Sequence, residues 1–114
     1  MVEIPQSKEF IWLNFNPQAG HEQRGRRPGL VVSKTEFNEK MGFVWICPIS
    51  STSRDNPFYV EISGVIGVSG KIFCDQLRSL DFRARGFDPS KDRIGECPEL
   101  LFKDVLRRIK PIIF

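Results

Sequence analysis

Hydrophobic residues gather in short runs that polar stretches rich in glycine and proline separate. Some runs are continuous, such as FVWIC at residues 43–47, and others alternate with polar residues, such as FYVEI at residues 58–62. Runs of four to eight β-branched and aromatic residues between turn signals predict β-strands. The expected strands are residues 10–15, 30–33, 43–47 (ending at Pro48), 58–62 and 71–77, with a strand or a turn over 65–68.

The C-terminal region changes to a helical period. Pro98 fits a first helical position, and Glu99 favours a helix N-terminus. We expect Pro111 to stop this helix and residues 112–114 to pack as a final strand. A short helical turn is expected at residues 35–40, closed by Gly42. The apolar face of the terminal helix comprises Phe102, Val105, Leu106 and Ile109, and Asp104 and Arg108 form an i, i+4 pair.

Five or six short strands and one terminal helix describe a small, mostly β (α+β) barrel. The length of 114 residues fits one domain, residues 1–114, and no repeat or linker divides it. Polar stretches follow the first and third strands. Because loops on a rigid scaffold commonly carry sites, we expect function there.

Composition excludes several classes of protein. Hydrophobic residues make up 40% of the chain and charged residues 27%, as in soluble globular proteins. No apolar run approaches the roughly 20 residues that span a bilayer. The N-terminus lacks the basic and apolar segments of a signal peptide, so we expect a cytoplasmic protein with no membrane association.

Cysteine and histidine usage gives no sign of a metal or cofactor. The three cysteines are odd in number and widely spaced among apolar neighbours, which indicates buried free thiols rather than disulfides or a zinc site. His21 stands alone, and paired acidic motifs are missing. We therefore expect no cofactor and no bound metal.

Arginine clusters are the main feature of the charge pattern, since the net charge is only +3. Such clusters suit phosphate binding, although solvated surface charge explains them equally well. They comprise Arg24, Arg26 and Arg27 in one stretch and Arg83 and Arg85 in another.

Three polar segments carry candidate chemistry. In the first loop, Glu22 is placed to orient Arg27. Ser50 follows a buried strand, and Asp75 with Gln76 ends another. A polar turn is the alternative for each of these. Phe15 and Phe82 are candidate stacking surfaces for bases, with core packing as the alternative.

Together these segments resemble the MazF/PemK toxins. The opening signature lies at residues 12–33, the second motif at 47–51 (CPISS) and the third at 75–85 (DQLRSLDFRAR). The resemblance implies a homodimeric SH3-like barrel that cleaves single-stranded messenger RNA sequence-specifically, without a metal. It also implies an mRNA interferase partnered by an antitoxin whose flexible acidic tail covers the site.

The resemblance also assigns roles. The catalytic arginine falls on Arg27 and the catalytic hydroxyl on Ser50. His21, Glu22 and Asp75 are the supporting or acid–base residues. The RNA-binding residues are expected to be Phe15, Gln23, Arg24, Arg26, Ser51, Gln76, Arg83 and Arg85.

The chain departs from the family pattern at four places. Residues 8–10 replace the usual opening of the first strand, Ser50 stands where threonine is commoner, and Gly29 where a larger apolar residue is usual. Phe73 occupies a position at which the PemK branch has a catalytic arginine, so a scheme based on Arg27 and Ser50 is favoured.

The expected reaction is attack by the 2′-hydroxyl of RNA, which gives a 2′,3′-cyclic phosphate and a 5′-hydroxyl. Arginine normally keeps its proton, so the base is expected to be His21 or Asp75. Alternatives are an SH3-like module that binds RNA or a protein tail without cutting, a gyrase-poisoning toxin of the same fold, and a purely structural domain.

Overall fold

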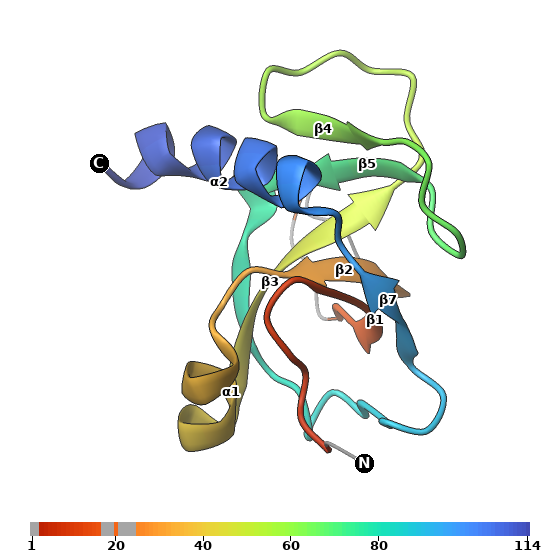
Figure 1. The fold of residues 1–114 in the computed structure, drawn as a ribbon, viewed down its shortest axis with the longest axis vertical. Helices are drawn as coiled ribbons and strands as arrows, with labels where there is room; N and C mark the ends of the chain where they lie inside the picture. Colours follow the sequence, from red (N-terminus) through yellow and green to blue (C-terminus); the bar gives the residue numbers. More distant parts are fainter. Residues whose placement is uncertain (1–2, 17–19, 21–24) are drawn as a thin grey trace.

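The computed structural model describes residues 3–16, 20 and 25–114, which form one sheet-based unit with two α-helices (Figure 1). Along the chain the elements are β1 (Glu9–Asn14), β2 (Arg26–Val31), α1 (Thr35–Met41), β3 (Phe43–Ser50), β4 (Tyr59–Ile62), β5 (Gly70–Phe73), the 3-10 helix η1 (Cys74–Gln76), β6 (Arg78–Asp81), β7 (Arg93–Glu96) and α2 (Glu99–Ile113).

All strand pairs are antiparallel, in the order β4-β5-β3-β2-β1-β7. The eight-residue β3 is the central strand, and on one side it changes partner along its length. Its first half pairs with β6, and its end, at Ile49 and Ser50, pairs with β5. The change occurs because η1 interrupts the chain between β5 and β6.

The central strands are buried on both faces, which explains their continuous apolar runs. Neighbouring residues such as Ile46 and Cys47 are both fully buried but belong to different hydrophobic clusters. One cluster includes the buried face of α2, with Phe102 and Val105, and the other includes Leu80 of β6. Figure 1 shows α2 lying across the end of the molecule that holds β4 and β5.

Most of the predicted elements are confirmed, and the mostly β fold with a terminal helix is as expected. Asp104 contacts Arg108 at 3.5 Å, as the spacing predicted. The three cysteines are free and buried. No helix in the described part of the chain is long and apolar enough to cross a membrane. Residues 65–68 form a turn region rather than a strand.

Two prolines act differently from the prediction. β3 continues through Pro48 to Ser50, because Pro48 lies where the ladder to β6 has ended and that to β5 has not begun. α2 continues through Pro111, so residues 112–113 are helical and form no strand. The Arg107 carbonyl that loses its helical donor belongs to an exposed residue, where water can replace it.

The predicted strand over residues 71–77 is also wrong in part. It divides into β5 and η1, and β6 follows. β7 was not predicted, because its burial is partial and its four residues include a glycine and two charges. β2 begins at Arg26, four residues before the predicted start. Its first two residues are therefore the candidate arginines Arg26 and Arg27.

Candidate active site

Arg27 and Ser50 lie at the same end of two paired strands. In the β2–β3 ladder Gly29 faces Pro48, so the register continued by two residues places Arg27 opposite Ser50. The Arg27 Nη1 atom donates a hydrogen bond to the Ile49 carbonyl oxygen at 3.3 Å. The guanidinium therefore reaches the backbone immediately before Ser50.

The Arg27 guanidinium is partly buried, which changes its pKa and its affinity for anions. Desolvation lowers its pKa from the ordinary value of 12.5, although an arginine keeps its proton at neutral pH. A partly dehydrated cation binds an anion more strongly than a fully hydrated one does, because less water must be displaced and the local dielectric is lower. This end of β2 can therefore hold a phosphate.

Gly29 explains how closely β2 and β3 approach beside the site. A Cβ atom at this position would lie 2.7 Å from Ile46 Cδ1 and 3.0 Å from the Cys47 carbonyl oxygen. Ile46 thus fills the space that a larger residue at position 29 would need. This packing accounts for the glycine at position 29.

Ser50 ends β3 with a half-buried side chain. Its hydroxyl donates to the Ser51 carbonyl oxygen at 3.4 Å, a long contact that a better acceptor can replace. Ser51 is exposed, and the loop turns at Thr52, whose Oγ1 accepts the Arg54 backbone N–H at 3.1 Å. Residues 51–53, which follow β3, are therefore part of a largely exposed loop that begins at the site.

Asp75 and Gln76 lie in η1, where β3 changes its partner. Asp75 is exposed and Gln76 is half-buried. A hydrogen bond with Cys74 and burial raise the pKa of the Cys47 thiol, and the nearby charge of Asp75 adds to this effect. The Asp75 charge therefore acts on Cys47, three residues before Ser50 on β3.

The arginines divide into two groups. Arg26 is exposed, forms an ion pair with Asp92 and lies 5.1 Å from the Trp12 ring centre. Arg83 is also exposed, over the Phe82 ring. Arg85 instead donates to the Asn14 and Asn16 carbonyl oxygens, where β1 leads into the polar loop.

Hydrogen bonds join the two described ends of the polar loop between β1 and β2. The Phe15 N–H bonds the Gly25 carbonyl oxygen at 2.8 Å, and the Gly25 N–H bonds Asn16 Oδ1 at 2.9 Å. Arg78, which the sequence analysis did not select, donates to the Phe15 carbonyl oxygen at 2.5 Å. Four predicted site residues lie outside the described part of the chain: His21, Glu22, Gln23 and Arg24.

The prediction that Phe15 stacks on RNA bases is wrong. Its side chain is 0% exposed and packs in the hydrophobic cluster that also holds Phe82. The alternating pattern of β1 turns both Leu13 and Phe15 inward, so no ring face reaches solvent. Phe73 is likewise buried and stacks on Tyr59, with 4.0 Å between ring centres.

Lys71 also lies at this site, although it was not predicted from the sequence. It pairs with Ser50 across β5 and β3, and its ammonium bonds the Arg54 carbonyl oxygen at 2.9 Å. A lone lysine in an apolar strand gives no sequence signal of a place beside Ser50, because the strand pairing that brings the two residues together is a tertiary property.

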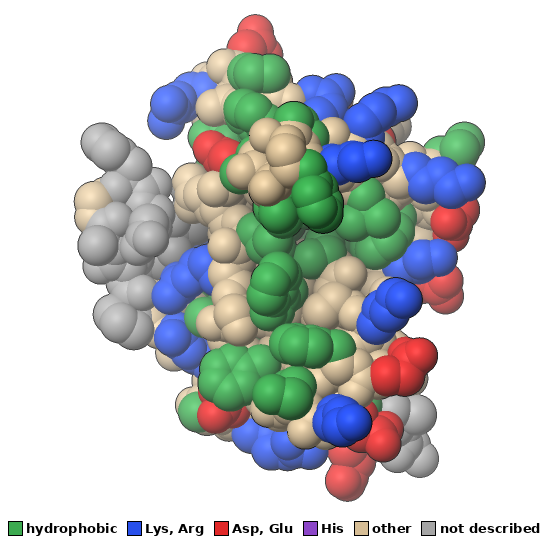
Figure 2. Space-filling view, turned by 90° about the vertical axis from the view of Figure 1, so that its left-hand side faces the viewer, with side chains coloured by type: hydrophobic (Ala, Val, Ile, Leu, Met, Phe, Trp, Pro, Cys, Tyr) green, Lys and Arg blue, Asp and Glu red, His purple; other side chains and the backbone are tan. Residues whose placement is uncertain are grey.

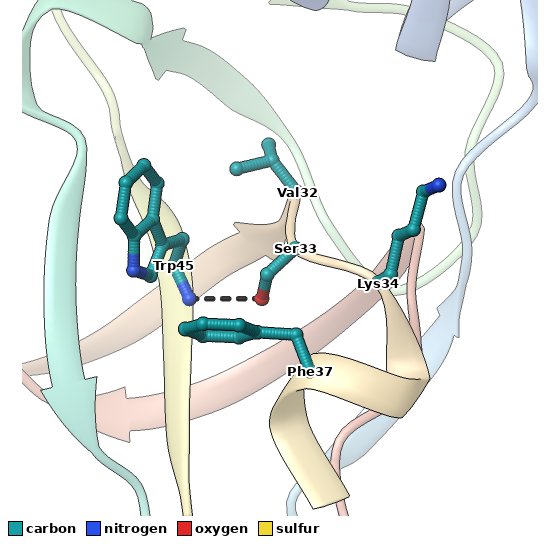
Figure 3. Close-up of a pocket in the computed structure, with 5 residues that line it drawn as sticks. All are labelled: Val32, Ser33, Lys34, Phe37 and Trp45. Carbon is teal, nitrogen blue, oxygen red and sulfur yellow. Dashed lines mark hydrogen bonds between the residues drawn. The ribbon is translucent and has the colours of Figure 1, made fainter. Parts of the chain in front are cut away.

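An apolar hollow lies away from these residues (Figure 3). It has a volume of about 320 Å³ and is lined by Val32, Ser33, Lys34, Phe37 and Trp45. The Ser33 hydroxyl accepts the Trp45 backbone N–H at 2.9 Å. Trp45 lies five residues before Ser50 on β3, roughly 16 Å along a strand.

The described residues contain no group of three or more His, Cys, Asp or Glu side chains that could hold a metal ion.

Comparison with known proteins gives consistent results. The family model of the PemK-like, MazF-like toxin of type II toxin–antitoxin systems matches residues 6–113. The endoribonuclease PemK of Escherichia coli is 37% identical over 108 residues, which cover 90% of this chain and 78% of that protein. The crystal structure of MazF from Deinococcus radiodurans superposes with a TM-score of 0.89 at 37% identity, covering 98% of both chains. A MazE–MazF crystal structure from the same organism gives a TM-score of 0.79 at 30% identity, covering 98% of this chain and 97% of that one.

Proposed function

The chain belongs to the PemK-like, MazF-like toxin family of type II toxin–antitoxin systems, and from this premise we propose that it is an endoribonuclease whose site is built around Arg27 and Ser50. The substrate is single-stranded RNA, including messenger RNA. Cleavage of messenger RNA inhibits translation and growth. The observation that carries the proposal is the position of the Arg27 guanidinium, 3.3 Å from the carbonyl oxygen of the residue before Ser50.

The proposed reaction uses the nucleophile of RNA itself. The 2′-hydroxyl attacks the adjacent phosphorus, the bond to the 5′-oxygen breaks, and the products are a 2′,3′-cyclic phosphate and a 5′-hydroxyl. Arg27 neutralises the charge that develops on the phosphate oxygens, and Ser50 donates a further hydrogen bond. His21 or Asp75 accepts the proton of the 2′-hydroxyl. The exposed Arg26, Arg83 and Ser51 and the half-buried Gln76 and Arg85 are the described residues proposed to contact RNA.

The test is cleavage of a long transcript with mapping of the ends. Arg27→Ala and Ser50→Ala are expected to fold but to cleave about 10²–10³ times more slowly, since each removes one preorganised donor. Arg107→Ala on α2 and Ser63→Ala in the loop after β4 remove exposed side chains of the same types as controls. Wild-type rates in Arg27→Ala or Ser50→Ala would refute the proposed site.

The same assay tests the remaining parts of the mechanism. Full activity in EDTA is expected for a reaction without a metal. The pH–rate profile of His21→Ala decides between the two bases, because an unchanged profile would leave the role to Asp75. RNA binding without product would favour the binding-module alternative, and inhibition of supercoiling would favour the gyrase alternative.

The proposed protein partner is an antitoxin with a flexible acidic tail. Solved structures similar to this chain include MazE–MazF complexes, which supports a partner of this kind. An acidic tail suits a site with exposed arginines, since it matches the charge of RNA and orders on binding. A small acidic protein encoded beside this one is expected to suppress cleavage when mixed with it. The toxin and its partner are then expected in the cytoplasm.

We also propose a homodimer formed through an apolar band of α1 and β3. Met41, Phe43 and Trp45 are 58%, 41% and 42% exposed. Figure 2 shows hydrophobic side chains running across this side of the molecule, with Lys and Arg side chains beside them. Hollows flank Trp45 on two sides, one of them lined also by Leu77 and Ser79. A twofold contact needs protrusions and hollows on one patch, as here.

The dimer is tested by sedimentation of Trp45→Lys, which places a charge in the apolar band and should yield monomers. Ile66→Lys is the control, because Ile66 is 94% exposed in the turn between β4 and β5. A Trp45→Lys protein that sediments as wild type does would rule out this face as the contact.

A further inference from the structure

The loop that begins at Ser50 is tied to β5 at two points, by Gly70 and by Lys71. We propose that Lys71 is a positioning residue for RNA cleavage: its ammonium fixes this loop and thereby holds the Ser50 hydroxyl toward the scissile phosphate. The inference rests on the proposed function, since it assumes that Ser50 contacts the substrate.

Strand register places the two side chains together. Ile49 pairs with Ile72, and both are buried, so the next pair along, Ser50 and Lys71, lies on the opposite face of the sheet. Directly opposed residues in an antiparallel pair have Cβ atoms about 5 Å apart. The stem of Lys71 therefore leaves the sheet beside the side chain of Ser50.

The ammonium of Lys71 reaches from this position to Arg54 and Asp55, which form the far end of the loop. Its Nζ atom donates to the Arg54 carbonyl oxygen at 2.9 Å and lies 3.9 Å from Asp55 Oδ1. The Lys71 side chain is 17% exposed, whereas that of Asp55 is fully exposed. The hydrogen bond to the carbonyl is the closer of the two contacts, and exposed ion pairs contribute little.

Gly70 supplies the second contact, at the near end of the loop. A Cβ atom there would lie 2.8 Å from the Ser50 carbonyl oxygen and 3.4 Å from the Ser51 nitrogen. The backbone of β5 therefore lies directly against the Ser50–Ser51 peptide. With Gly70 at one end and Lys71 at the other, the loop has a defined path, and loss of the ammonium frees its far end.

A positioning lysine and a phosphate-binding lysine predict different kinetics. Because the ammonium is engaged with the loop, its removal should misplace Ser50 without removing a contact to RNA. The rate at saturating RNA should then fall while KM and its salt dependence stay the same. A direct phosphate contact would raise KM and reduce the slope of affinity against salt by about one ion.

The experiment measures kcat and KM at several salt concentrations on an RNA oligonucleotide with one cleavage site. Lys71→Met is expected to lower kcat about 10–100-fold, the range for a misplaced catalytic group, with KM changed less than about twofold. Lys71→Arg, whose guanidinium can bond the same carbonyl, should restore most of the rate. Lys103→Met, which removes an exposed lysine on α2, is the control for net charge.

Lys71→Ala, which also lacks a hydrogen-bond donor, is read in the same way if Lys71→Met does not fold. Wild-type kcat in a folded Lys71 variant would overturn the inference, as would a rise in KM with a reduced salt slope. A fall in kcat that Lys71→Arg does not restore would also count against it, because the arginine keeps the donor.

Combination with Ser50→Ala separates this inference from the proposed function. If Lys71 acts through Ser50, Lys71→Met should lower kcat less than about twofold further in the Ser50→Ala background, because residues that act as a unit are not additive. Independent, multiplicative effects would overturn the inference alone. Wild-type kcat in Ser50→Ala would instead remove the proposed function, and the positioning role with it.

Discussion

Replacing Gly70 by alanine tests the close contact between β5 and the Ser50 loop. Gly70 has φ of +110°, which L-residues rarely adopt, and its added Cβ would meet a backbone oxygen at 2.8 Å. The backbone strain costs about 1–2 kcal/mol. The overlap adds about 1–3 kcal/mol, because the Ser50 carbonyl belongs to a paired strand and cannot move as a flexible side chain can. We expect a loss of about 2–5 kcal/mol in the free energy of unfolding.

Gly64→Ala is the matched control for this prediction. Gly64 also has a positive φ, +73°, but a Cβ there meets no atom within 4 Å. Its cost should be the backbone strain alone, about 1 kcal/mol. The assay is urea denaturation followed by tryptophan fluorescence, with equal slopes required for comparison. Equal losses in the two variants would refute the argument that Gly70 is required by the approach to Ser50.

Two further predictions concern α2 and the strand end beside it. Phe102→Ala should lower the free energy of unfolding, measured by urea denaturation, by about 3–5 kcal/mol, since Phe102 is 6% exposed in the core. Leu100 is 82% exposed, so Leu100→Ala should change this free energy by less than about 0.5 kcal/mol. Similar losses in the two variants would contradict the assigned helix face. Burial, assisted by the charge of Glu99, raises the pKa of the Cys97 thiol from 9.0 to about 12. The unfolded chain therefore loses this proton at a lower pH than the folded protein does. The free energy of unfolding should then fall as the pH rises from 9 toward 12. Urea midpoints measured across this range should fall less steeply in Cys97→Ala, and identical slopes would exclude the thiol as a cause.

The candidate site was predictable from the sequence where it depends on motifs. Arg27 and Ser50 could be named because each lies in a segment of characteristic residue order, and the structure places both at one end of the β2–β3 pair. The core position of Phe15 was not predictable in the same way. An aromatic residue at a strand end is compatible with a core or a surface position, and only packing against the second cluster decides between them.

The sequence by itself determined the local features: most strand positions, the amphipathic face of α2, the buried thiols and the family motifs. Each is encoded within a few neighbouring residues, because strand and helix periods are properties of short segments. Tertiary structure alone decided that Pro48 continues a strand, that η1 divides residues 71–77, and that Lys71 stands opposite Ser50. These outcomes depend on which strands pair and in which register, and that choice is made by contacts between residues far apart in the chain.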